Sequence, residues 1–222
     1  MAYNNAWNAV FSNNSWGRYP AEDLVRFIAR NFYNKDRKDI RILEIGCGPG
    51  GNLWFFAREG FATYGVDGSK LAIDASIERL DLEIPGWQGE ILQHDFCNKL
   101  PFNDGFFDAI IDNEAVCCND FEVSKDIYSD CYRVLRESGK IFVRTFTTNS
   151  EGCCSGSEVS YNAYLTDDAI SKGIDYIRFT SEQDIKVLLS DFSIETLDVT
   201  NKSNNGELDR ITEEWIIVAK KK

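Results

Sequence analysis

Glu44-Ile45-Gly46-Cys47-Gly48-Pro49-Gly50-Gly51 is the stretch that decides the fold, because a glycine-rich turn directly follows a short apolar run over 40–45. A helix-like segment over 52–59 comes next, so the glycines join a buried strand to a helix. Open parallel sheets present ligands at this point, outside the carboxyl ends of their strands. Glycines also let the backbone turn sharply and pass close to a ligand. The loop therefore predicts a ligand site on an α/β sheet.

Strand-like and helix-like segments alternate on both sides of this loop, which is typical of a parallel sheet covered on both faces. The last two strands have no helix between them, and Asn204-Asn205-Gly206 predicts a turn. We expect a Rossmann-like α/β fold: a seven-stranded, mostly parallel sheet with helices on both faces and a C-terminal antiparallel hairpin. The expected helices cover 21–31, 52–59, about 71–80, 121–137 and a segment capped by Ser181 and Asp184; the expected strands cover 40–45, 62–67, 90–95, 106–112, 140–146, 194–200 and 214–219.

Two stretches depart from this alternation. Residues 1–20 hold Trp7, Phe11, Trp16 and Tyr19 among Asn and Ser, and residues 147–179 are longer than a normal connection. We expect a single domain over 1–222, with 1–20 as an aromatic lid segment and 147–179 as an insertion that covers the cleft. A satellite hydrophobic cluster under the first helix is an alternative for the aromatic residues.

Two ligands fit the glycine loop. Gly46, Gly48 and Gly51 satisfy the GxGxxG pattern of dinucleotide sites, and Asp67 stands where such sites hold a ribose-binding acid. However, an acidic residue such as Glu44, two positions before the first glycine, is unusual in dinucleotide loops. The presence of Glu44 therefore favours the second ligand, which is S-adenosylmethionine.

The sequence resembles the class I S-adenosylmethionine-dependent methyltransferases in its Glu-x-Gly-x-Gly-x-Gly loop, in Asp67, in Asp95-Phe96, in 107–112 and in Arg133-Val134-Leu135-Arg136-Glu137-Ser138-Gly139-Lys140. The resemblance implies S-adenosylmethionine as cofactor. Its implied binding residues are Glu44, Gly46, Cys47, Gly48 and Gly50 in the loop, Asp67 and Gly68 at the ribose, Asp95 and Phe96 at the adenine, Asp112 and Asn113 at the methionine moiety, and Arg18 and Tyr19 in the lid.

The resemblance extends to bacterial methyltransferases that modify surface polysaccharides and sugars, through 19–32 and 51–60. It implies methyl transfer to a small-molecule acceptor, such as a sugar or sugar nucleotide. A hydroxyl acceptor needs a general base, for which Glu114 is the candidate; a solvated or helix-capping acid is the alternative. An NAD-dependent oxidoreductase and a cofactor-binding module without catalysis remain open as rival functions.

The charge balance of 24 basic and 36 acidic residues gives a formal net charge of -12. We therefore expect no nucleic acid and no membrane among the partners, because both binding modes depend on Lys and Arg. No signal peptide or run of roughly 18 apolar residues is present, which predicts a cytoplasmic protein. The oligomeric state stays open, with a homodimer as one arrangement.

Seven cysteines include the adjacent pairs Cys117-Cys118 and Cys153-Cys154, and the single histidine is His94. Neither pair has the spacing of a zinc site, so we expect no metal. The thiols are interpreted as reduced side chains of a cytosolic protein. A site for trivalent arsenic, which prefers several converging thiolates, is the alternative.

Overall fold

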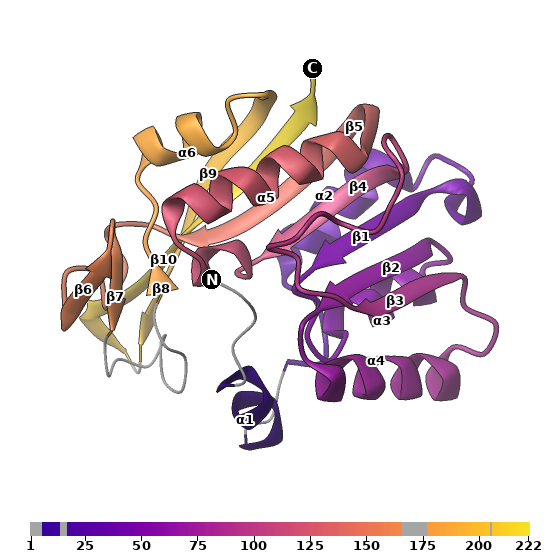
Figure 1. The fold of residues 1–222 in the computed structure, drawn as a ribbon, viewed down its shortest axis with the longest axis horizontal. Helices are drawn as coiled ribbons and strands as arrows, with labels where there is room; N and C mark the ends of the chain where they lie inside the picture. Colours follow the sequence, from indigo (N-terminus) through magenta and orange to yellow (C-terminus); the bar gives the residue numbers. More distant parts are fainter. Residues whose placement is uncertain (1–5, 14–16, 166–176, 205) are drawn as a thin grey trace.

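The computed structural model describes residues 6–13, 17–165, 177–204 and 206–222. Within these ranges, seven strands form the main sheet in the order β3-β2-β1-β4-β5-β10-β9 (Figure 1). Strand β10 pairs antiparallel with β5 and β9, whereas the pairs on the β3-to-β5 side are parallel. The expected fold, including its closing hairpin, is confirmed. The strand bounds are β1 Arg41–Ile45, β2 Ala62–Asp67, β3 Gly89–Gln93, β4 Phe107–Asn113, β5 Leu135–Phe146, β9 Phe192–Asn204 and β10 Glu207–Lys221.

Helices cover both faces of this sheet. On one face pack α2 (Glu22–Phe32), α3 (Gly51–Arg58) and α4 (Lys70–Glu83), and on the other α5 (Phe121–Val134) and α6 (Glu182–Leu188). Each helix buries one stripe of apolar side chains against the sheet, which produces two core clusters. In α2 this stripe consists of Leu24, Phe27, Ile28 and Phe32.

Side chains at the helix starts match the sequence prediction. The Ser69 hydroxyl accepts from the Ala72 amide at the start of α4, and Ser181 and Asp184 form the expected reciprocal capping box of α6. The short 3-10 helices η1 (Arg37–Asp39) and η2 (Val116–Cys118) lie before β1 and before α5. These caps fix where α4 and α6 begin relative to the sheet edge.

Several predicted boundaries were wrong, and strands β5, β9 and β10 are longer than expected. Helix α5 ends at Val134 rather than at residue 137, because the chain becomes extended from Leu135 onward. Lys221 on β10 donates to the carbonyls of Tyr132 and Leu135, so a side chain distant in sequence satisfies the helix end. Strand β3 ends at Gln93, two residues earlier than expected, which places the following residues in a loop.

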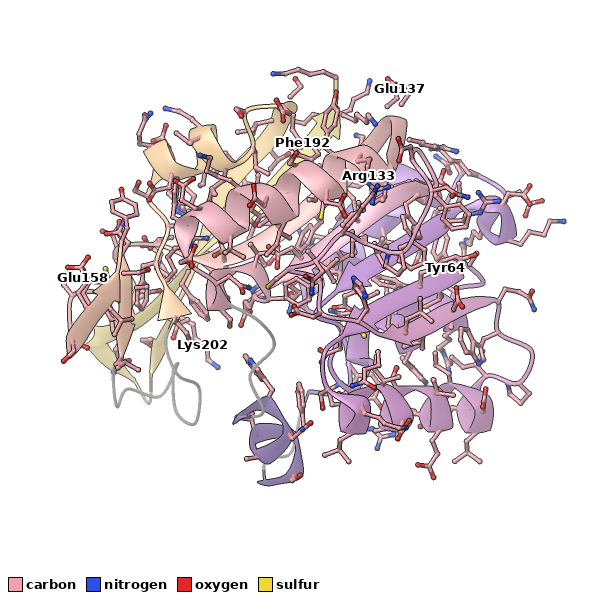
Figure 2. The ribbon with its side chains drawn as sticks, in the orientation of Figure 1. Tyr64, Arg133, Glu137, Glu158, Phe192 and Lys202 are labelled. Carbon is pink, nitrogen blue, oxygen red and sulfur yellow. The ribbon has the colours of Figure 1, made fainter. Side chains whose placement is uncertain are left out.

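The two irregular stretches contain more structure than the sequence indicated. Residues 6–13 form helix α1 (Ala6–Asn13), and the described part of 147–179 forms a small sheet of β6 (Ser157–Ser160), β7 (Ala163–Leu165) and β8 (Ile177–Arg178). The β9–β10 hairpin runs beside this insertion, because the Thr147 amide donates to the Glu213 carbonyl. Figure 2 marks the small sheet with Glu158 and the hairpin with Lys202, on the same side of the molecule.

Candidate active site at the carboxyl edge of the sheet

The loop between β1 and α3 is a cradle that excludes side chains. Gly46, Gly48 and Gly50 all have positive φ angles, of 63°, 51° and 77°. A Cβ atom on Gly46 would lie 2.4 Å from the Ala115 Cβ, and one on Gly50 would lie 2.1 Å from the Ser76 Oγ. The loop therefore requires glycine for both its backbone angles and its close neighbours.

Asp67, at the end of β2, holds this loop to the next strand. Its carboxylate accepts from the Gly48 amide at 2.9 Å and from the Ser69 amide at 2.8 Å. The side chain is buried, and desolvation raises its pKa although both hydrogen bonds oppose the shift. Sequence reasoning assigned Asp67 only to a ribose, whereas the structure gives it a second task of bracing the glycine loop.

Two neighbours complete this part of the edge. Gly68 accepts through its carbonyl from the Gln93 side chain at 3.1 Å, which ties the turn after β2 to β3. The Cys47 amide donates to the Val66 carbonyl, and burial raises the pKa of the Cys47 thiol well above its usual range. Cys47 is thus a neutral, packed side chain inside the loop.

Glu44 carries a buried carboxylate oxygen without a partner among the described residues. Its Oε1 accepts from the Asn52 side chain at 2.6 Å, while Oε2 is buried and unpaired. Desolvation, together with the Asp67 and Asp112 carboxylates, raises the pKa of Glu44 to about 8. A cationic or hydrogen-bond-donating ligand group beside Oε2 would relieve this arrangement.

Asp95 and Phe96 lie in the loop after β3. Asp95 accepts from the Cys97 amide at 3.0 Å, and the Phe96 ring packs toward the glycine loop, 3.3 Å from where a Gly46 Cβ would stand. Strand β3 ends at Gln93, so His94 and Asp95 both lie in this loop rather than on a strand. The Phe96 ring therefore forms one wall of the glycine cradle.

Asp112, at the end of β4, is fully buried and already hydrogen-bonded. It accepts from the Tyr128 hydroxyl at 2.6 Å and from the Ala115 and Val116 amides at 3.0 and 3.1 Å. The Asp112 carboxylate oxygens thus already have partners within the protein. Through them Asp112 shapes the turn after β4, beside the half-buried Asn113, and its contact with a methionine moiety stays a prediction. Tyr128 lies on α5, and no local sequence signal marks its hydroxyl as a partner of a residue on β4.

Glu114 follows directly, in a left-handed conformation with φ of 62°. Its carboxylate lies 3.2 Å from the Arg144 Nε, and Arg144 also pairs with Glu214 on β10. Burial and the neighbouring Glu214 carboxylate raise the pKa of Glu114. Sequence reasoning missed both Arg144 and Glu214, since they come together only when β10 pairs with β5.

The N-terminal segment reaches the same edge through α1. The Ser69 hydroxyl donates to the Asn8 side chain at 2.7 Å, and the Gly17 carbonyl closely faces Gly51. Arg18 pairs with Glu83 at the far end of α4, and Tyr19, 68% exposed, packs on Trp54, so the cofactor contacts of these two side chains stay a prediction. The backbone of this segment, rather than those side chains, faces the loop. Trp16 lies outside the described residues.

The cysteine pairs lie around one small apolar cluster near the insertion. Cys117 belongs to this cluster, Cys118 and Cys153 pack against it, and the Cys153 and Cys154 sulfurs are 3.7 Å apart. In the described part of the chain, no group of three or more His, Cys, Asp and Glu side chains is arranged to hold a metal ion.

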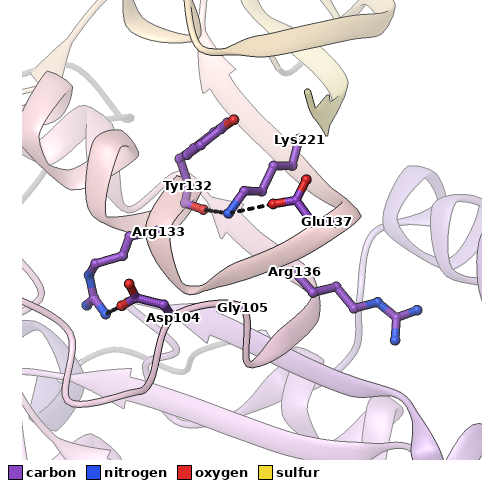
Figure 3. Close-up of a pocket in the computed structure, with 7 residues that line it drawn as sticks. All are labelled: Asp104, Gly105, Tyr132, Arg133, Arg136, Glu137 and Lys221. Carbon is purple, nitrogen blue, oxygen red and sulfur yellow. Dashed lines mark hydrogen bonds and ion pairs between the residues drawn. The ribbon is translucent and has the colours of Figure 1, made fainter.

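A shallow pocket of about 800 Å³ lies at the opposite end of the sheet (Figure 3). Gly105 precedes β4, and Glu137 and Lys221 stand where β5 begins and β10 ends, so this end is remote from the glycine loop. Its cations are already paired, Arg133 with Asp104 and Lys221 with Glu137. Figure 2 likewise places Arg133 and Glu137 at that end. We therefore assign the candidate site to the carboxyl edge.

Residues 42–139 match a family model described as "Methyltransferase domain". Two relatives are named 18S rRNA (guanine-N(7))-methyltransferase: that of Bos taurus is 34% identical over 123 residues, and that of Mus musculus is 31% identical over 120 residues. These stretches cover 51% and 50% of this chain but only 42% and 40% of the relatives. The chain thus spans about two-fifths of the length of the curated relatives it matches.

Solved structures share the fold at low identity. An S-adenosylmethionine-dependent methyltransferase from Methanosarcina mazei has a TM-score of 0.70 and 20% identity, covering 85% of this chain and 95% of its own. A 1,6-didemethyltoxoflavin-N1-methyltransferase from Burkholderia thailandensis, solved with S-adenosylhomocysteine, has a TM-score of 0.66 and 14% identity, covering 96% and 81%. The chain therefore has the fold of S-adenosylmethionine-dependent methyltransferases, and its residues 42–139 are similar to the methyltransferase domain.

The expectation that nucleic acid is excluded as a partner was wrong, since both relatives are named as rRNA methyltransferases. It rested on the net charge of the whole chain. Charge acts on a ligand over about 8–10 Å, so a total cannot exclude a polyanion from one local surface. Among the residues that the structure describes, no helix is long and apolar enough to cross a membrane.

Proposed function

We propose that this protein transfers a methyl group from S-adenosylmethionine to an acceptor at the carboxyl edge of the sheet. The observation that carries the proposal is the unpaired, buried Oε2 of Glu44 beside a glycine loop that excludes side chains. An ammonium group placed there would satisfy Oε2, and the methionine part of S-adenosylmethionine carries one. The rival NAD has no such group to pair with this oxygen.

The residues around the loop have separate tasks in this proposal. The glycine backbone and Cys47 shape the cradle, and Asp67 and Gly68 lie where the ribose is expected. Asp95 and Phe96 flank the adenine, while Asp112 and Asn113 support the methionine side. When bound, the cofactor supplies an electrophilic methyl group on sulfonium sulfur, so the protein has mainly to orient the acceptor and exclude water.

We further propose a small-molecule acceptor with a hydroxyl group, such as a sugar or sugar nucleotide, with Glu114 as its general base. A hydroxyl loses a proton when it is methylated, and a carboxylate at this edge can take that proton. The names of the relatives favour a second candidate, the N7 atom of guanine in RNA. This nitrogen carries no proton in neutral guanine, so its methylation needs no base.

Calorimetric titration with S-adenosylmethionine, S-adenosylhomocysteine and NAD tests the cofactor. We expect micromolar binding of the first two and none of NAD; binding of NAD alone would favour an oxidoreductase. S-adenosylhomocysteine release is then followed with UDP-glucose and with a guanosine-containing RNA oligonucleotide. Cofactor binding without product from either would favour the non-catalytic binding module. A cytoplasmic location and a homodimer stay predictions.

The two acceptors are separated by the Glu114→Gln variant. Methylation of a hydroxyl should fall by about 100-fold or more without the base, the usual range for general base catalysis. Methylation at guanine N7 should change little. A variant that keeps full activity on a hydroxyl acceptor would remove Glu114 from the proposed mechanism.

A further inference from the structure

A single arginine serves two carboxylates beside the proposed methyl-transfer site. Arg144 lies on β5, opposite Asn113 of β4 on one side and Ile216 of β10 on the other. Glu114 follows the end of β4, and Glu214 lies two residues before Ile216 on β10. Three elements therefore bring one guanidinium and two acids together at the carboxyl edge of the sheet.

The two acids are bound unequally. Arg144 donates from Nε to the Glu214 Oε1 at 2.8 Å and from Nη2 to the Glu214 Oε2, so Glu214 receives a two-pronged contact. The Glu114 Oε1 lies 3.2 Å from the same Nε, whose one hydrogen is directed to Glu214. Glu114 thus lies beside the positively charged guanidinium of Arg144, but the Nε hydrogen of this group already donates to Glu214.

The two glutamate side chains also differ in their exposure to solvent. The Glu214 side chain is 7% exposed and that of Glu114 is 34% exposed, so Glu114 is the member that an acceptor can reach. The left-handed backbone of Glu114 is held by a hydrogen bond from its amide to the Arg144 carbonyl at 2.9 Å. A residue with a Cβ seldom adopts this conformation, so the surrounding structure directs the carboxyl.

The other titratable groups around the pair add negative charge. Asp23 on α2 acts on Arg144, and Asp112 on β4 acts on Glu114. On η2, the buried thiol of Cys117 remains neutral because its pKa is well above the usual range. Among the described residues, Arg178 is the cation that acts on Asp112, whereas Arg144 is the cation paired with Glu114 and Glu214, and its two-pronged contact goes to Glu214.

We propose that Glu214 is a positioning residue for the reaction: by occupying the Nε and Nη2 donors of Arg144, it leaves the carboxylate form of Glu114 able to take a proton from the acceptor. This inference rests on the proposed function. In the step, the O–H bond of the acceptor breaks and its proton passes to a Glu114 oxygen. The freed lone pair forms the new bond to the methyl carbon, and the electrons of the broken carbon–sulfur bond stay on sulfur.

Carbon-13 NMR of glutamate side-chain carboxyl carbons tests this assignment on the free protein. We expect one glutamate, missing from the Glu114→Gln spectrum, to titrate with a midpoint near pH 8. In Glu214→Gln the freed Arg144 charge should favour the Glu114 anion, so that midpoint should fall by one unit or more. Glu182→Gln, an exposed acid paired with Lys186, is the matched control and should leave the midpoint unchanged.

Two results would overturn the inference. One is a wild-type Glu114 that titrates near the ordinary glutamate value of about 4.3, and this measurement needs no variant to fold. The other is a Glu214→Gln protein, folded by circular dichroism, whose Glu114 midpoint equals that of wild type. Because no cofactor or acceptor is present, these results are independent of the calorimetric test of the methyltransferase proposal.

Discussion

Replacement of Asp67 by alanine should weaken both the fold and cofactor binding. The carboxylate accepts from the amides of Gly48 and Ser69, both of which are buried. A buried donor left without an acceptor costs about 1–3 kcal/mol, so the two together set a range of about 2–6 kcal/mol. The raised pKa of Asp67 shows that burial also disfavours its anion, so the loss belongs in the lower half of this range, about 2–4 kcal/mol.

Urea unfolding followed by circular dichroism measures this loss at pH 7. Asp67→Asn should fall between wild type and Asp67→Ala, because an amide oxygen can accept from one donor while its NH₂ group faces the other. Asp74→Ala is the control: this exposed acid pairs with Lys70 one turn away, and such pairs contribute about 0.3–0.5 kcal/mol. Calorimetry on the folded variants then measures the affinity for S-adenosylmethionine.

If Asp67→Ala is as stable as Asp74→Ala, the two hydrogen bonds do not brace the loop. If it loses stability but binds S-adenosylmethionine as wild type does, the assignment of Asp67 to the ribose fails. The expected result is loss of both, with a greater than tenfold weaker affinity.

Three further perturbations address the loop, a buried acid and the thiols. Gly50→Ala should abolish binding in calorimetry and lower the melting temperature, whereas Gly60→Ala, with φ of 85° but open space around it, should cost only about 1 kcal/mol. Wild-type stability should fall in urea titrations as pH rises from about 4.3 to 8, because the folded pKa of Glu44 is raised to about 8; Glu44→Gln should flatten this fall. Cys153→Ser should leave S-adenosylmethionine affinity and methyl transfer unchanged, and a loss of either would revive a thiol-dependent function.

The parts of the fold that were predictable depend on local signals. Glycines with positive φ, a serine cap and period-two or period-3.6 apolar patterns are properties of short segments, and they placed β1, β2, α3 and α6 within one or two residues. The end of α5 was predicted wrongly because Lys221, which lies far away in the sequence, donates to the carbonyls at this helix end. Helix α1 was not predicted because its eight residues carry neither an acidic residue in the first turn nor a basic residue in the last turn, which are usual signals of helix ends.

The candidate site likewise contains residues that local sequence signals predict and residues that they do not. The loop, Asp67 and Glu114 could be found from spacing and resemblance, because they follow strands directly. The Arg144–Glu214 pair could not, since 70 residues separate its members and only antiparallel pairing of β10 with β5 brings them together. The backbone amides that donate to Asp67 and Asp112 could not be predicted either, because a backbone amide carries no sequence signal.

This division explains why the sequence predicted the cofactor more sharply than the acceptor. The cofactor side consists of the ends of β1, β2 and β4 with their following loops, where residue type and chain position coincide. In the proposed mechanism, the acceptor side is made by Glu114, the β9–β10 hairpin and the insertion; the hairpin and the insertion meet through contacts such as that of Thr147 with Glu213. The net charge of -12 could not predict the acceptor, because it is spread over the whole surface. In the proposed mechanism the acceptor instead meets the local charges of Arg144 and its acids, within a few ångströms. Under the proposed function, an acceptor whose reacting atom carries a proton should depend on Glu114, and an acceptor whose reacting atom carries none should not.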